Sequence, residues 1–161
     1  MPLSIDVQVS TERQSEVDLN SAQYQQWMQI AFEHIAELET ESDSIQASLQ
    51  QEAVIRLVDE AESQELNLAY RQKNKPTNVL SFSYDDLPDY LGDIVICVPI
   101  VESEAIAQNK VFQDHMTHMI VHGTLHLLGY DHEIDEEAAL MESIEINILK
   151  RIGVDNPYEP I

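Results

Sequence analysis

Short apolar runs typical of β-strands alternate along the chain with longer segments of helical periodicity, and this alternation narrows the folds open to it. Apolar and polar residues alternate over 3–9, which predicts a strand with one buried face. Further strands are predicted at 54–58, 79–84 and 93–98. Helices are predicted at 21–38, 101–109, 112–128 and 133–152, with a short one through 66–70. The order β-α-β-α-β-β-α-α-α predicts a single α+β domain over residues 1–161, with a mixed sheet of about four strands and helices packed on it.

Five residues are expected to mark the ends of these elements. Asn20 or Ser21 can cap the first long helix. Gly129 and Gly153 are expected to end the last two helices, because glycine adopts the left-handed conformation that follows a helix. Pro99 is predicted near the end of the fourth strand, where the loss of a backbone N–H is tolerated.

The composition allows a packed core but excludes a broadly basic surface. Hydrophobic residues make up 43% of the chain, which is enough for a folded domain. Eight Lys and Arg residues stand against 30 Asp and Glu residues, giving a formal net charge of −22 at pH 7. This charge disfavours unspecific binding to nucleic acids and docking to an anionic membrane, but it leaves room for a small local RNA site.

The cysteine content and the apolar runs predict a cytoplasmic protein without a membrane partner. Cys97 is the only cysteine, so no internal disulfide can form, and we expect its thiol in the core. The first residues lack a basic segment followed by a long apolar one. The longest apolar stretch, 94–101, is too short to span a bilayer.

A dense group of histidines, from His115 to His132, predicts a metal site. His122 and His126 are four residues apart on one predicted helix, so their imidazoles project from the same face about 6 Å apart. Two neutral imidazoles at this spacing can bind one Zn²⁺. Gly129 then lets the chain turn back, which brings His132 round as a third ligand. The pattern HxxxHxxGxxH therefore predicts one zinc ion per chain, with the open fourth position of a catalytic site.

The other histidines are expected to pack or to support the ligands. His115 and His118 continue the same helical stripe, seven and four residues before His122. His34 lies on the first predicted helix and is expected to be structural or on the surface. The alternative for the whole group is that its members only cap and pack the helix.

Gly123 occupies the position that holds a glutamate in the peptidase pattern HExxHxxGxxH. That glutamate takes the proton of the water that the metal activates, so its absence disfavours peptide hydrolysis by this route. Phosphodiester cleavage depends less on such a base, because a metal ion and a cation can stabilise the charge on phosphate oxygens.

Two places in this acidic chain offer cations to a phosphate. Arg56 lies inside the apolar run 54–58, where a guanidinium either pairs with a carboxylate or points into a cleft. Arg71, Lys73 and Lys75 lie in a window, 66–84, without Asp or Glu. This basic loop either contacts an RNA strand or is an ordinary solvated loop.

Four segments resemble the bacterial YbeY-type endoribonucleases in order and spacing: IRLVDEAESQELNLAYR, NKPTNVLSF, LGDIVIC and HMIVHGTLHLLGYDH. The resemblance runs from about residue 54 to the C-terminus, and residues 1–50 match only in pattern. It implies a zincin-like metal helix, with zinc ligands at His122, His126 and His132. It also implies that Arg56 is the functional arginine and faces the phosphate.

The resemblance further implies a single-strand-specific, zinc-dependent endoribonuclease that acts in small-subunit (16S) rRNA 3′-end maturation and in ribosome quality control. Its implied partners are single-stranded rRNA, the small ribosomal subunit with one of its proteins, and an Era-type GTPase. Water and the 2′-hydroxyl of the RNA both stay open as the attacking group. The alternatives are a non-catalytic, zinc-stabilised ribosome assembly factor and, less favoured by Gly123, a metallopeptidase or amidase.

Overall fold

The computed structural model describes residues 3–12, 20–38, 51–84, 86–131 and 133–159. Four strands and five helices lie within these ranges. The strands are β1 (Ser4–Val9), β2 (Glu52–Val58), β3 (Val79–Phe82) and β4 (Tyr90–Cys97). The helices are α1 (Ser21–Leu38), α3 (Glu60–Arg71), α4 (Val98–Ala107), α5 (Phe112–Leu127) and α6 (Asp135–Ile152).

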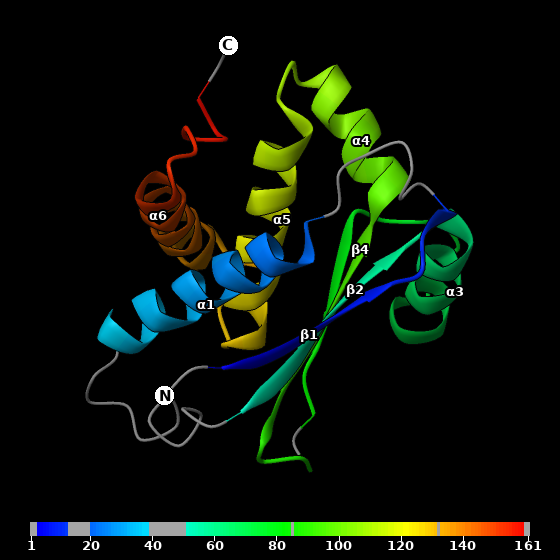
Figure 1. Cartoon of the computed structure of the whole chain (residues 1–161), viewed down its shortest axis with the longest axis horizontal. Helices are drawn as coiled ribbons and strands as arrows, with labels where there is room; N and C mark the ends of the chain where they lie inside the picture. The colour runs from blue at the N-terminus through cyan, green and yellow to red at the C-terminus, as the bar shows by residue number, and fades with distance from the viewer. Residues whose placement is uncertain (1–2, 13–19, 39–50, 85, 132, 160–161) are drawn as a thin grey trace.

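The strands form one mixed sheet in the order β1-β2-β4-β3. β1 and β4 both pair with β2 in parallel, and β3 runs antiparallel to β4 at the edge. Helices lie on both sides of this sheet, with α3 on one side and α1, α5 and α6 on the other (Figure 1). The predicted single α+β domain with a four-stranded mixed sheet is therefore confirmed.

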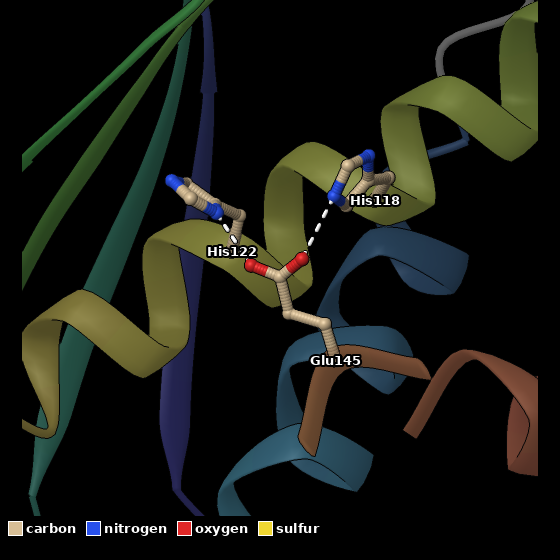
Figure 2. Close-up of side chains that lie close together, drawn as sticks. All are labelled: His118, His122 and Glu145. Carbon is tan, nitrogen blue, oxygen red and sulfur yellow. Dashed lines mark hydrogen bonds and ion pairs between the residues drawn. The ribbon is translucent and has the colours of Figure 1, made fainter. Parts of the chain in front are cut away.

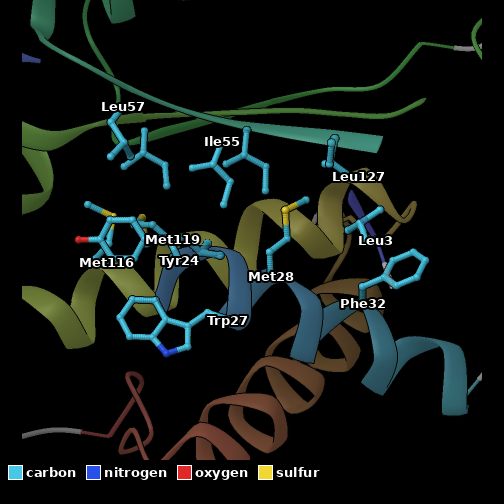
Figure 3. Packing of buried hydrophobic residues seen from close by; sticks show 14 of the residues in the cluster. Leu3, Tyr24, Trp27, Met28, Phe32, Ile55, Leu57, Met116, Met119 and Leu127 are labelled. Atoms are coloured by element: carbon cyan, nitrogen blue, oxygen red, sulfur yellow. The ribbon is translucent and has the colours of Figure 1, made fainter. Parts of the chain in front are cut away.

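The main hydrophobic core lies between the sheet and the helices α1 and α5 (Figure 3). On β2, Ile55 and Leu57 face this core and are fully buried. Because successive side chains of a strand point to opposite faces, Arg56 between them points to the other side. The α1 side chains buried here and against α6 recur at the predicted helical spacing: Tyr24, Trp27, Met28, Ala31, Phe32 and Ile35.

A smaller core fills the opposite face, beneath α3 and the start of α4. It contains Val58, Leu80, Val95 and Cys97, with Leu66 of α3 packed against them. Cys97 is buried there, as predicted. The two cores together fix the sheet between α5 on one side and α3 on the other.

Several ends of elements differ from the prediction. β4 begins at Tyr90, not 93, because Tyr90 and the following residues pair with the first residues of β2. Pro99 lies in the first turn of α4 and not in a strand; its missing N–H costs nothing there, because first-turn N–H groups have no intrahelical partner. β3 ends at Phe82, two residues early. Asn20 caps α1 as predicted, its side-chain oxygen accepting a bond from Gln23 N at 3.1 Å.

Within the described residues, no helix combines the length and the apolarity needed to cross a lipid bilayer.

Candidate metal centre

Helix α5 carries two of the three predicted metal ligands, His122 and His126, through the middle of the protein. It lies between the sheet and the helices α1 and α6, so most of its residues are buried. Its four histidines follow one stripe at spacings of three and four residues. Neighbouring rings along this stripe lie close, with centroids 6.0 Å apart for His115 and His118, 6.1 Å for His118 and His122, and 4.6 Å for His122 and His126.

The imidazoles of His122 and His126 converge on one point. Their Nε2 atoms lie 3.1 Å apart. Zinc–nitrogen bonds measure about 2.0–2.1 Å, so two nitrogens at this separation can both reach one ion. The donor set therefore fits a metal ion shared by the two rings. His132, the third predicted ligand, lies outside the described residues.

Behind His122 lies a carboxylate that the sequence analysis missed. Glu145 of α6 is completely buried, and its two oxygens lie 2.5 Å from His122 Nδ1 and 2.9 Å from His118 Nε2 (Figure 2). The hydroxyl of Tyr158, beyond the end of α6, also donates to Glu145. Burial raises the pKa of Glu145, but the hydrogen bonds and charges of His118 and His122 outweigh it and bring this pKa down to about 2.

His118, His122 and Glu145 together form a group that can hold a metal ion, since their ligand atoms lie within 4.8 Å of one another. The separations of 2.5 and 2.9 Å are also those of charge-assisted hydrogen bonds from imidazole N–H groups to a carboxylate. We favour the hydrogen-bonded interpretation, because it leaves His122 Nε2 directed at His126. His115, the first histidine of the stripe, bonds instead to Glu104 of α4 at 2.9 Å.

The turn after α5 has the geometry that the sequence predicts. Gly129 adopts a left-handed conformation with φ of 96°, and the helix ends at Leu127. The N–H of Gly129 bonds to the carbonyl of His126, and the N–H of Tyr130 bonds to that of Leu125. This pair of bonds is a Schellman motif, which reverses the chain just after the metal helix.

Gly123 has a packing role in addition to marking the absence of a catalytic glutamate. A Cβ atom at this position would lie 2.8 Å from Cγ2 of Ile94 on β4, closer than real Cβ contacts come. The backbone of α5 therefore approaches the sheet closely at this point. Ser81 of β3 joins the contact by donating a hydrogen bond to the Gly123 carbonyl, at 3.1 Å.

Arg56 lies on the opposite face of the sheet from α5, so the structure does not bring it together with His122 and His126. Its Nε and Nη2 atoms donate to the two oxygens of Glu62 on α3, at 2.5 and 2.9 Å. Nη1 donates to Gln8, and Nη2 also reaches Ser10. The guanidinium thus joins β2 to the end of β1 and to α3, and about a third of the side chain is exposed.

The basic loop begins at Arg71, the last residue of α3, and continues beyond the helix on the same side of the sheet as Arg56. The side chains of Arg71, Lys73 and Lys75 are all exposed. Asn67 fixes the backbone between them, because its amide donates to the Lys75 carbonyl at 2.9 Å and its own carbonyl accepts from Lys73 N. The rings of Tyr70 and Phe82 contact each other beside the loop, with centroids 5.1 Å apart and planes inclined by 56°.

A cavity of about 250 Å³ opens beside the histidine pair. Its walls come from α5, α6 and the segment after α6, and they consist of His122, Ala138, Met141, Glu142, Glu145 and Tyr158. The Tyr158 ring meets the His118 ring edge-on, with centroids 5.5 Å apart. Burial, and then the bond to Glu145, raise the pKa of Tyr158 above its ordinary value, so its hydroxyl keeps its proton.

Comparisons with known proteins identify the family of the chain and a similar fold. The sequence model of the family described as endoribonuclease YbeY matches residues 9–153. Among solved structures, the chain is similar to the solution structure of TM1509 from Thermotoga maritima, with 26% identical residues and a TM-score of 0.53. That similarity covers 92% of this chain and 88% of TM1509. Because the family match covers most of the chain, including β2, β3, β4 and the whole histidine-bearing helix, the chain belongs to the YbeY family of endoribonucleases.

Proposed function

We propose that the protein is a zinc-dependent, single-strand-specific endoribonuclease that acts in small-subunit (16S) rRNA 3′-end maturation and in ribosome quality control. The observation that carries the zinc site is the 3.1 Å separation of His122 Nε2 and His126 Nε2. Membership of an endoribonuclease family supports RNA as the substrate.

In this proposal His122, His126 and His132 hold one Zn²⁺. When bound, the ion would supply Lewis-acid chemistry, polarising a phosphoryl oxygen and acidifying a water. The protein's own part is to hold the ligands rigidly: α5 is packed on the sheet through Gly123, and Glu145 bonds to His122 from behind.

The cations of the opposite face are proposed to bind RNA away from the cleavage point. Arg71, Lys73 and Lys75 present an exposed positive patch in a chain of net charge −22, and a phosphate backbone is attracted to such a patch. The Tyr70 ring beside it is exposed and can stack on a base. Arg56 keeps its family-based role as a functional arginine, and its exposed third is the part that a phosphate can reach.

The partners that we propose are the small ribosomal subunit with one of its proteins, and an Era-type GTPase, all in the cytoplasm. The net charge of −22 supports a basic partner protein, which attracts an acidic surface. A protein of this charge repels RNA phosphates, but contacts with a basic ribosomal protein would overcome the repulsion. The ribosome would then supply most of the affinity for the RNA substrate.

The charge also supports the second candidate, a zinc-stabilised assembly factor that does not cleave RNA. A peptidase is disfavoured, because a glutamate at position 123 is absent and would clash with Ile94.

Cleavage of a labelled single-stranded RNA that spans a small-subunit rRNA 3′ end tests the proposal. The variants are His126→Ala and Arg56→Ala, with His34→Ala as a matched histidine control on α1 and zinc content measured for each. We expect His126→Ala to lose zinc and activity, Arg56→Ala to lose activity but keep zinc, and the control to resemble the wild type. Equal cleavage by all preparations would show a contaminating nuclease and favour the assembly factor.

A matched variant separates the two roles open to Arg56. Glu62→Gln weakens the ion pair that holds Arg56 but keeps the guanidinium. If Arg56 contacts RNA, Glu62→Gln retains cleavage while Arg56→Ala loses it. If Arg56 only joins β2 to α3, the two variants lose stability and activity together.

A further inference from the structure

We propose that Tyr158, acting through Glu145, is a positioning residue for His122, so that the segment after α6 forms part of the metal centre. This inference rests on the proposed binding of Zn²⁺ by His122 and His126. It concerns residues that lie outside the HxxxHxxGxxH pattern and come from a different part of the chain.

First, the contact with Glu145 determines which nitrogen of His122 carries the proton. Its Nδ1 lies 2.5 Å from Glu145 Oε1. A carboxylate oxygen accepts hydrogen bonds, so Nδ1 of this ring donates and carries the proton. A neutral imidazole has only one N–H, which leaves Nε2 with a lone pair. This Nε2 is the atom that points to His126, 3.1 Å away. Glu145 therefore selects the tautomer of His122 that can bind a cation at the proposed site.

The second step is the position of Glu145 itself. Its side chain is completely buried, and its position is set by what it contacts. His118 bonds to Oε2 at 2.9 Å, and the Tyr158 hydroxyl donates to the same oxygen. Three donors thus hold one carboxylate, and two of them approach the oxygen that His122 does not use. Tyr158 fixes the rotation of the carboxylate, and with it the direction of the bond to His122.

The third step is that Tyr158 is itself held in place. Gly153 ends α6 in a left-handed conformation, and the chain beyond it packs back towards α5. Lys110, just before α5, reaches the carbonyl of Pro157 at 3.3 Å. Tyr158 N donates to the side-chain oxygen of Asn156 at 2.8 Å. The hydroxyl is therefore presented by an anchored segment, although the residue as a whole is 43% exposed.

The test measures zinc affinity and the His122 tautomer, not activity. The variants are Tyr158→Phe, which removes only the hydroxyl, Glu145→Gln, and the two combined. Tyr84→Phe is the matched control, because Tyr84 also donates its hydroxyl to a carboxylate, that of Asp93 on β4. Affinity is measured with Zn²⁺ in competition with a chromophoric chelator. Imidazole ¹⁵N resonances of the metal-free proteins report the tautomer.

We expect Glu145→Gln to weaken zinc binding about 10- to 100-fold, as for other groups that orient a ligating histidine. Tyr158→Phe should weaken it about two- to tenfold, the effect of one hydrogen bond, and should shift the His122 nitrogen resonances towards a tautomer mixture. Because Tyr158 acts through Glu145, the double variant should bind no worse than Glu145→Gln alone. Tyr84→Phe should bind zinc like the wild type.

Two results would overturn the inference. If Tyr158→Phe matches the wild type in zinc affinity and in the His122 resonances, Tyr158 is only a packing residue. If the loss of zinc-binding free energy in the double variant equals the sum of the losses in the two single variants, Tyr158 does not act through Glu145. A further variant, His122→Ala, separates this failure from failure of the proposed function. If His122→Ala binds zinc as tightly as the wild type, the proposed metal site is refuted. If it loses zinc binding, His122 remains a ligand and only the role of Tyr158 is refuted.

Discussion

The close contact between α5 and the sheet predicts how the protein responds to a single added carbon. In Gly123→Ala the new Cβ would lie 2.8 Å from Cγ2 of Ile94 and 3.2 Å from its Cγ1 and Cδ1. Ile94 is completely buried, so it has little room to move. Overpacking of this kind costs about 1–3 kcal/mol. Alanine is about 1 kcal/mol better than glycine inside a helix, so we expect a net loss of about 0–2 kcal/mol in the free energy of unfolding.

The same contact predicts that the effect of Gly123→Ala on stability changes sign when Ile94 is also replaced by alanine. Ile94→Ala removes the three carbons that meet the new Cβ, at a cost of about 2–5 kcal/mol for the cavity. In that background Gly123→Ala should stabilise the protein by about 1 kcal/mol, because only the gain in helix propensity remains. The coupling between the two substitutions is then about 1–3 kcal/mol.

Urea unfolding of the four proteins, followed by circular dichroism, measures these values. Gly153→Ala is the control, since a Cβ at that position meets nothing within 4 Å and the residue has a φ of 100°. It should destabilise through backbone strain, equally in both backgrounds. If Gly123→Ala stabilises the wild type by about 1 kcal/mol, the approach of α5 to β4 is looser than described and the reasoning is refuted.

Three further predictions concern buried groups and the metal. Burial lowers the pKa of His115 below its ordinary 6.5, although its hydrogen bond with Glu104 acts in the opposite direction. The free energy of unfolding should therefore be highest above about pH 6.5 and should decrease as the pH falls through the lowered pKa. In His115→Gln this decrease should be smaller. Burial raises the pKa of the Cys97 thiol to about 11, so a thiol reagent at pH 8 should label it only after unfolding. Zn²⁺ at 100 times its Kd should stabilise the protein by about 2.7 kcal/mol, and a chelator should abolish this gain.

Most of the fold follows from patterns that are local in sequence. The alternation of β1 and the helical spacing of α1 depend only on neighbouring residues, so both elements were predicted. The start of β4 was missed because it is set by pairing across the sheet: Tyr90 lies opposite Glu52, 38 positions earlier, while Gly92, two residues after Tyr90, is typical of a loop. The position of Pro99 was also ambiguous, because proline suits both the end of a strand and the first turn of a helix.

The candidate site was predictable only as far as its motif extends. Glu145 lies among several other acidic residues of α6, and its partner His122 is 23 positions away. One unused signal was present: Glu145 lies on the stripe of Met141, Ile144 and Ile148, which are buried, and this spacing puts a carboxylate on the core-facing side of the helix. Tyr158 gives no such signal, since its role depends on how the chain folds back after α6.

The pairing of Arg56 was open for a similar reason. A guanidinium in an apolar strand predicts a partner, but Asp59, Glu60 and Glu62 all follow within six residues. Only the direction of α3 decides among them, and it selects Glu62.

If the basic loop and the histidines have the roles proposed above, their placement on opposite sides of the sheet sets a minimum length for the RNA substrate. An RNA strand that touches Lys73 or Lys75 and is cut at His122 must pass round the β3 edge, because the sheet itself blocks a direct path. Such a strand spans several nucleotides between the two points. A dinucleotide is too short to contact both sides of the sheet. Its cleavage rate therefore depends on the histidines and not on the cations of the basic loop. Cleavage of short and long oligonucleotides should therefore diverge when the loop is neutralised, and the chain length at which they diverge measures the path.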